Sequence, residues 1–103
     1  MKKSNYAYFL DVELEDATRA EPHYLEALDI AQNTFGQKHP VYLEMLFDVG
    51  SYYAYYEEHL KAIPYFQEGI ATLEQVVRTQ YAQLDETSRN KYIELLMLSL
   101  IHI

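Results

Sequence analysis

Apolar residues recur at helical spacing along most of the chain. Between residues 20 and 35 they follow at steps of four, three, one, three and four, which places one stripe on one side of an α-helix: Ala20, Tyr24, Ala27, Leu28, Ala31 and Phe35. The stripe stops at Gly36, and glycine adopts the left-handed backbone conformation that ends many helices. We therefore predict a helix that ends at Phe35.

Two further helices are predicted on either side of a polar corner. Pro40 suits a first helical turn, because the N–H that proline lacks would have no partner there. The apolar positions that follow predict a helix over residues 40–56, the sequence Glu-Glu-His at 57–59 forms the corner, and a third helix is predicted over 60–80, with Pro64 in or near its first turn. The acidic and hydroxyl residues at 85–88 are typical of a helix start, and predict a last helix carrying Tyr92, Leu95 and Leu96.

The first and third of these helices repeat one pattern. Residues 20–30 read AEPHYLEALDI and residues 62–72 read AIPYFQEGIAT, so alanine, proline, an aromatic, glutamate, a small residue and an aliphatic residue recur 42 positions on. Small beside large residues at one period are expected where helical hairpins stack, since antiparallel helices in close contact leave little room for side chains. We predict small residues at the close contacts (Ala20, Ala27, Gly50, Ala62 and Gly69) and aromatic residues in the wider gaps (Tyr24, Tyr53 and Phe66).

The charge and composition narrow the classes of function. Sixteen acidic residues against eight basic ones give a net charge of −8, which disfavours binding to nucleic acid or to an anionic membrane. The chain has no cysteine, which excludes disulfides and thiolate chemistry. Residues 1–10 lack the apolar run of a signal peptide, and no stretch is long enough to span a bilayer. We expect a soluble, cytoplasmic protein.

At these positions the chain resembles the tetratricopeptide repeat family. The second unit supplies Leu46, Val49, Gly50, Tyr53, Ala62, Phe66 and Gly69, and the first supplies Ala20, Tyr24 and Ala27. The period of 42 and the linker FGQKHP at residues 35–40 are similar to the kinesin-light-chain subtype. The resemblance, over about residues 5–80, implies an all-α fold of antiparallel helical hairpins stacked as an α-solenoid superhelix. It also implies a non-catalytic module that binds a protein or peptide partner without a cofactor.

On this resemblance the chain divides into units. We expect a degenerate first unit over residues 1–35, a second unit over 36–80 and the start of a further helix over 81–98. Residues 5–7 (Asn-Tyr-Ala) resemble residues 41–43 (Val-Tyr-Leu) at an offset of 36, so about six residues are missing. Either the first helix is shortened, or it runs irregularly into the second. Two units are fewer than the roughly three that a solenoid needs for stability, which predicts marginal stability or self-association through exposed end helices.

Two segments near the C-terminus indicate a longer parent protein. Residues 81–92 are similar to a segment that follows the last repeat in bacterial proteins joining such repeats to a caspase-like CHAT protease domain. If so, the repeats are a regulatory arm of that protein. Residues 98–103, LSLIHI, resemble the translated end of a transposon-type sequencing adapter, so we expect a truncated or adapter-derived tail and exclude it from function.

One face of the second helix is the candidate binding site. In the family the concave surface comes from the first helix of each unit, and steps of three and four place five residues on one face here: Glu44, Phe47, Asp48, Ser51 and Tyr55. An exposed Phe47 beside tyrosine and acids would suit a peptide with apolar and basic residues. The alternative, that Phe47 packs against a neighbouring repeat, stays open.

The polar residues give no stronger alternative. His23, His39 and His59 lie near glutamates, but no two histidines are three or four residues apart on one helix and no HExxH is present, whereas zinc needs three or four converging ligands. The acids at positions 11, 13, 15 and 16 indicate a solvated helix end, because paired carboxylates catalyse only in a cleft that raises one pKa. We predict no metal site and no enzymatic activity.

Overall fold

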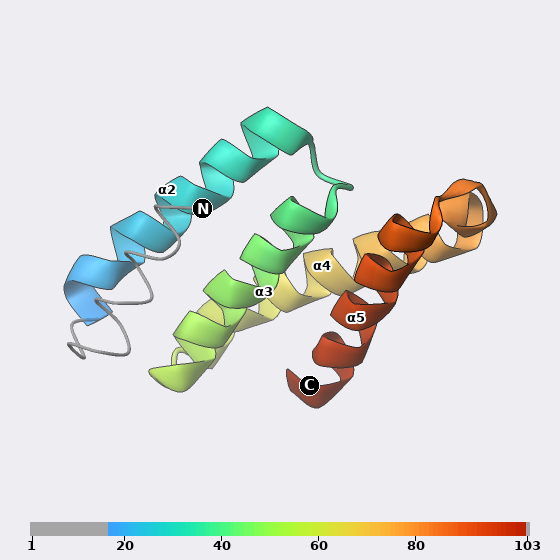
Figure 1. Ribbon diagram of the computed structural model, residues 1–103. Helices are drawn as coiled ribbons and strands as arrows, with labels where there is room; N and C mark the ends of the chain where they lie inside the picture. Colours follow the sequence, from blue (N-terminus) through green and yellow to red (C-terminus); the bar gives the residue numbers. More distant parts are fainter. Residues whose placement is uncertain (1–16, 103) are drawn as a thin grey trace.

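Four α-helices form the described part of the chain. The computed structural model describes residues 17–102: α2 (Ala17–Phe35), α3 (Pro40–Tyr55), α4 (His59–Gln80), the 3₁₀ turn η2 (Tyr81–Gln83) and α5 (Glu86–His102). Successive helices reverse direction, and α3 lies between α2 and α5 with α4 behind it (Figure 1). No strand occurs between residues 17 and 102. The predicted all-α fold of antiparallel helical hairpins is therefore confirmed.

The linker between α2 and α3 follows the sequence closely. Gly36 has φ of 87°, a left-handed conformation that glycine adopts without steric cost, and α2 ends at Phe35 as predicted. The Phe35 ring stacks on His39 at a centroid distance of 4.5 Å. His39 Nδ1 accepts a hydrogen bond of 3.1 Å from the N–H of Val41 and so caps the start of α3. Pro40 is the first residue of α3, as predicted.

The corner between α3 and α4 is closed by backbone hydrogen bonds. Glu57 adopts φ of 61°, which is uncommon for a residue with a side chain. In this conformation Glu57 N–H donates to the Ala54 carbonyl at 3.1 Å, and Glu58 N–H donates to the Tyr53 carbonyl at 2.8 Å, so the last carbonyls of α3 are satisfied. The helices end and begin within one residue of the predicted bounds.

Pro64 lies just past the first turn of α4, near its predicted place. Pro64 lies five residues past the first residue of α4, His59, so it stands in the second turn and removes the hydrogen bond to the carbonyl of residue 60. Pro22 of α2 is its counterpart in the first repeat, 42 residues earlier (64 − 22). Both helices therefore carry a proline at the same position of the repeat.

The five small residues predicted for the close contacts are all buried: Ala20, Ala27, Gly50, Ala62 and Gly69. A Cβ atom on Gly50 of α3 would lie 3.0 Å from the ring of Phe66, and one on Gly69 of α4 would lie 2.8 Å from the ring of Phe47. Each helix thus presents a glycine to a phenylalanine of the other, and no larger residue fits there without a shift.

Larger side chains complete the core around α3, which packs against α2, α4 and α5. Tyr24, Leu46 and Tyr53 are buried as predicted, and Phe66 is half-buried. The Tyr53 hydroxyl donates to Glu21 Oε2 of α2 at 2.8 Å. Burial, and then the hydrogen bond to this carboxylate, raise the pKa of the Tyr53 phenol. Tyr53 therefore joins α3 to α2 by a hydrogen bond in addition to apolar packing.

The last helix begins where the polar residues predicted a start. Asp85 Oδ1 accepts a 2.7 Å hydrogen bond from the N–H of Ser88 and so caps α5. This bond lowers the pKa of the Asp85 carboxyl, because it stabilises the ionised form. The predicted start of a helix at residues 85–88 is confirmed.

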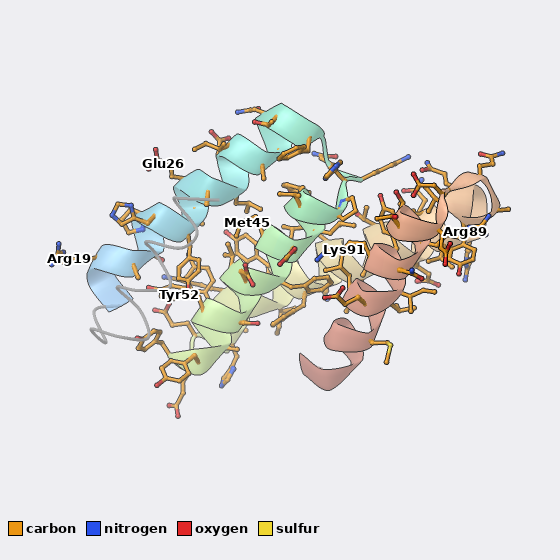
Figure 2. The ribbon with its side chains drawn as sticks, viewed as in Figure 1. Arg19, Glu26, Met45, Tyr52, Arg89 and Lys91 are labelled. Atoms are coloured by element: carbon orange, nitrogen blue, oxygen red, sulfur yellow. The ribbon has the colours of Figure 1, made fainter. Side chains whose placement is uncertain are left out.

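Polar and apolar contacts fix α5 to the rest of the fold. Arg89 donates to the carbonyl oxygens of Tyr81 and Ala82 at 3.0 and 2.7 Å, at the turn between α4 and α5 (Figure 2). The Tyr92 hydroxyl donates to the carbonyl oxygen of Lys38 in the α2–α3 linker. Tyr92 and Leu95 are buried against α3 and α4. The orientation of α5 is therefore determined by contacts with three separate segments.

Some predictions concern residues that the structure does not describe. The shortened first helix, the acids at positions 11, 13, 15 and 16, and the side chains of the segment 98–103 lie outside the described residues. The division of the chain into units stays a prediction as well.

The reciprocal glycine contacts predict the effect of adding one methyl group. Gly69→Ala places a Cβ against the buried Phe47 ring, and such overpacking costs about 1–3 kcal/mol, which exceeds the roughly 1 kcal/mol gained in helix propensity. Gly50→Ala should lower stability less, because the half-buried Phe66 ring can give way. Urea unfolding followed by circular dichroism measures both. A Gly69→Ala protein as stable as the wild type would contradict the close contact.

Candidate functional site

One stripe of α3 is left partly open to solvent by the helices around it. It consists of Glu44, Asp48, Ser51 and Tyr55, which follow at steps of four, three and four. Glu44 and Tyr55 are exposed, and Asp48 and Ser51 are half-buried. The ring of Tyr55 is 70% exposed, the largest exposed fraction among the described aromatic side chains. We call these four residues the α3 stripe.

Phe47, the fifth residue predicted for this face, does not belong to the stripe. Only 6% of its surface is exposed. Its ring lies against Gly69 and 6.3 Å from the ring of Phe66, centroid to centroid. The expected exposed phenylalanine was wrong. The physical reason is the space above Gly69, which a large ring fills. The alternative, that Phe47 packs against a neighbouring repeat, does not describe this contact either, because Gly69 and Phe66 lie on α4, within the same predicted unit, 36–80.

The acids of the stripe differ in environment. Burial, with a smaller contribution from the neighbouring Glu44, raises the pKa of the Asp48 carboxyl to about 6. Asp48 forms no hydrogen bond or ion pair with any other described residue. The middle of the stripe therefore holds a carboxylate that is partly desolvated and is not neutralised by the helices described.

Helix α5 places a cation at one end of the stripe. Lys91 Nζ lies 3.3 Å from Glu44 Oε2 and 3.9 Å from Glu94 Oε1, and Figure 2 shows Lys91 between α3 and α5. The groups of the Lys91–Glu44 pair are partly exposed, so this ion pair is weak and open to exchange. Lys91 was not predicted from the sequence, because no local pattern places α5 beside α3.

Other exposed apolar side chains lie outside the stripe. Leu60 is 87% exposed and Ile63 is also exposed, both on α4, and Ile93 and Met97 are exposed on α5. The position 42 residues before Leu60 is threonine, so the repeat pattern itself does not require an apolar residue there. Leu60 is a useful reference for Tyr55, because both are highly exposed but on different helices.

The described side chains give no sign of a metal centre or a membrane span. No three or more histidines, acids or cysteines among them are placed to hold a metal ion. His39 caps α3 within the linker. None of the helices between residues 17 and 102 combines the length and apolar character that crossing a bilayer requires.

The antiparallel helices repeat the same sequence pattern every 42 residues. This arrangement defines a helical-repeat protein. The model of the tetratricopeptide repeat family matches residues 2–75, so the chain belongs to this family. The chain matches no curated protein and no solved structure. Proteins of this family generally mediate protein–protein interaction and are typically non-catalytic scaffolds.

The raised pKa of Asp48 predicts a pH-dependent effect on stability. The folded state favours the protonated carboxyl, so this group's contribution to stability is complete below the unfolded pKa of about 3.9 and is lost as the pH rises through about 6. Asp48→Asn should therefore raise the free energy of unfolding at pH 7, by up to about 3 kcal/mol, and change it little at pH 3.

Urea unfolding at both pH values measures this effect. Asp29→Asn on the exposed side of α2 is the matched control, and its effect should be small at both. An equal effect of Asp48→Asn at pH 3 and pH 7 would contradict the assignment.

Proposed function

We propose that the chain is a non-catalytic interaction module whose α3 stripe lines a concave face and binds a peptide segment or partner domain. One observation carries the proposal: an aromatic ring that is 70% exposed stands on the same open face as a partly desolvated carboxylate without a partner among the described residues. Membership of a family that generally mediates protein–protein interaction supports it.

The chemistry of the stripe indicates the class of ligand. The Tyr55 ring offers a large apolar surface with few rotatable bonds, which is why tyrosine is frequent at binding sites. The carboxylates of Glu44 and Asp48 accept charge-assisted hydrogen bonds, and the Ser51 hydroxyl between Asp48 and Tyr55 can donate or accept. A peptide with one basic and one apolar side chain fits these groups. The net charge of −8 would attract such a cationic ligand at low ionic strength.

Within the family, we assign the chain to a group with kinesin-light-chain-like repeats of 42 residues. The prolines inside α2 and α4, Pro22 and Pro64, lie 42 residues apart (64 − 22) and support this period. The linker supports it too, because Gly36 and His39 each have a structural role in ending α2 and starting α3.

A second candidate function is a regulatory repeat arm of a larger bacterial protein with a caspase-like CHAT protease domain. The segment 81–92 that resembles such proteins contains the cap of α5 and the residues Arg89 and Tyr92, which fix α5 to the repeats. A domain joined after α5 would then move with the repeats. The genomic sequence beyond residue 98 tests this: a caspase-like reading frame supports the arm, and a stop codon directly after the repeats excludes it.

Self-association through the end helices is a further prediction. Exposed Ile93 and Met97 on α5 support it, because apolar side chains four residues apart form one strip on a helix. Analytical ultracentrifugation over a concentration series measures the effect of Met97→Asp, which should lower the association constant. A chain that stays monomeric at every concentration would contradict the prediction.

Replacing Tyr55 tests the proposed function. Peptides selected on the wild-type chain from a random displayed library should bind Tyr55→Ala at least tenfold more weakly, since truncating a central aromatic residue commonly costs more than about 1.4 kcal/mol. Leu60→Ala removes an even more exposed apolar side chain elsewhere and should leave the affinity unchanged. Isothermal titration calorimetry measures both. Undiminished binding by a folded Tyr55→Ala protein would contradict the proposal.

A further inference from the structure

The α3 stripe already receives one cationic group from its own chain. The ammonium of Lys91 on α5 lies 3.3 Å from Glu44 Oε2 and also reaches Glu94 Oε1 at 3.9 Å. The contact joins residues 47 positions apart (91 − 44) on two different helices, so it depends on how α5 packs. This end of the stripe therefore binds a primary ammonium in the folded protein itself.

The contact with Lys91 leaves part of the negative charge of the α3 stripe without a neighbouring cation. Glu44 and Asp48 are one helical turn apart, about 6 Å along the axis, and Asp48 and Tyr55 are about 10 Å apart. Lys91 pairs with Glu44, and Asp48 has no such partner among the described side chains. A single cation positioned between the two acids could interact with both, which Lys91 in its observed place does not.

The distances also set a spacing for a ligand. A point midway between Glu44 and Asp48 lies about 13 Å from Tyr55 along α3. An extended peptide advances about 3.3 Å per residue and its side chains alternate between two faces, so this span corresponds to four ligand residues, whose first and last side chains share a face. A basic side chain between Glu44 and Asp48 would then lie four positions from an apolar side chain on Tyr55. Arginine suits the basic position better than lysine, because its planar guanidinium has several donors for two carboxylates.

We propose that Lys91 is an intramolecular competitor for the basic residue of a bound extended peptide. The peptide's arginine displaces the Lys91 ammonium from Glu44 and bridges Glu44 and Asp48, and an apolar residue four positions along packs on Tyr55. This inference rests on the proposed function, and it adds the ligand's chemistry and the group that opposes its binding. Because the Lys91 pair is partly exposed and therefore weak, the competition lowers affinity without preventing binding.

If Lys91 competes with the peptide's arginine, removing the Lys91 ammonium should strengthen peptide binding. The probe is a synthetic ten-residue peptide of glycine and serine that carries one arginine and, four positions along, one leucine. NMR titration should show Lys91→Gln binding this probe about two- to fivefold more tightly than the wild type, the range expected for loss of one exposed ion pair. A role of Lys91 in stability alone would leave the affinity unchanged or lower it.

A matched variant separates local competition from net charge. Arg78→Gln removes the same single positive charge, and it breaks an exposed ion pair with Glu74 at 2.8 Å on α4. It should leave the affinity for the probe within error of the wild type. If Arg78→Gln strengthens binding as much as Lys91→Gln does, the effect is one of net charge and the competitor role is overturned.

Probe variants test the ligand itself. Glutamate in place of the arginine should abolish binding, and moving the leucine next to the arginine should weaken it severalfold. Equal binding of the three probes would overturn the proposed ligand, as would failure of the wild-type chain to bind the arginine–leucine probe.

The outcomes distinguish this inference from the proposed function. If Tyr55→Ala weakens binding but Lys91→Gln does not strengthen it, the competitor role fails and the interaction module stands. If Tyr55→Ala changes neither binding of the probe nor binding of library-selected peptides, the proposed function fails.

Discussion

The reciprocal contact between two glycines and two phenylalanines determines how α3 and α4 pack. The ring of Phe47 lies over Gly69, and the ring of Phe66 lies over Gly50, so that an added Cβ atom would lie 2.8 Å and 3.0 Å from the respective ring. The two rings also stack on each other at 6.3 Å. This contact sets the position of α3 relative to α4. Because α3 also contacts α2 and α5, the packing of these two helices depends on the same contact.

The candidate site is the part of α3 that this packing leaves open. Three helices surround α3, so its exposed side is the α3 stripe, from Glu44 to Tyr55. The core beneath the stripe changes the environment of these residues. Asp48 is close enough to the core for burial to raise its pKa to about 6, so at neutral pH it lowers stability. A residue that opposes stability on an otherwise consistent fold is a reasonable marker of function. Lys91 belongs to the same surface because α5 docks against α3.

Local features of the sequence predicted the helices and their ends, whereas contacts between distant residues decided the site. The stop at Gly36 and the start at Pro40 depend on backbone conformation that one or two residues specify, and the small residues were marked by the 42-residue repeat. Phe47 lies at the right helical spacing for the stripe, but a glycine 22 residues later provides the space that buries it (69 − 47). Lys91 could not be placed on this surface before the packing of α5 was known.

Amide hydrogen exchange of the free protein tests the central claim most directly, namely that the glycine–phenylalanine contact makes α3 the most firmly held helix. Exchange from the interior of a cooperative core requires global unfolding, whereas loosely held helices exchange by local opening. The account predicts that amides around Gly50 in α3 exchange most slowly, at the free energy of global unfolding, and that those of α5 exchange faster. Exchange in α3 as fast as in α5 would contradict it.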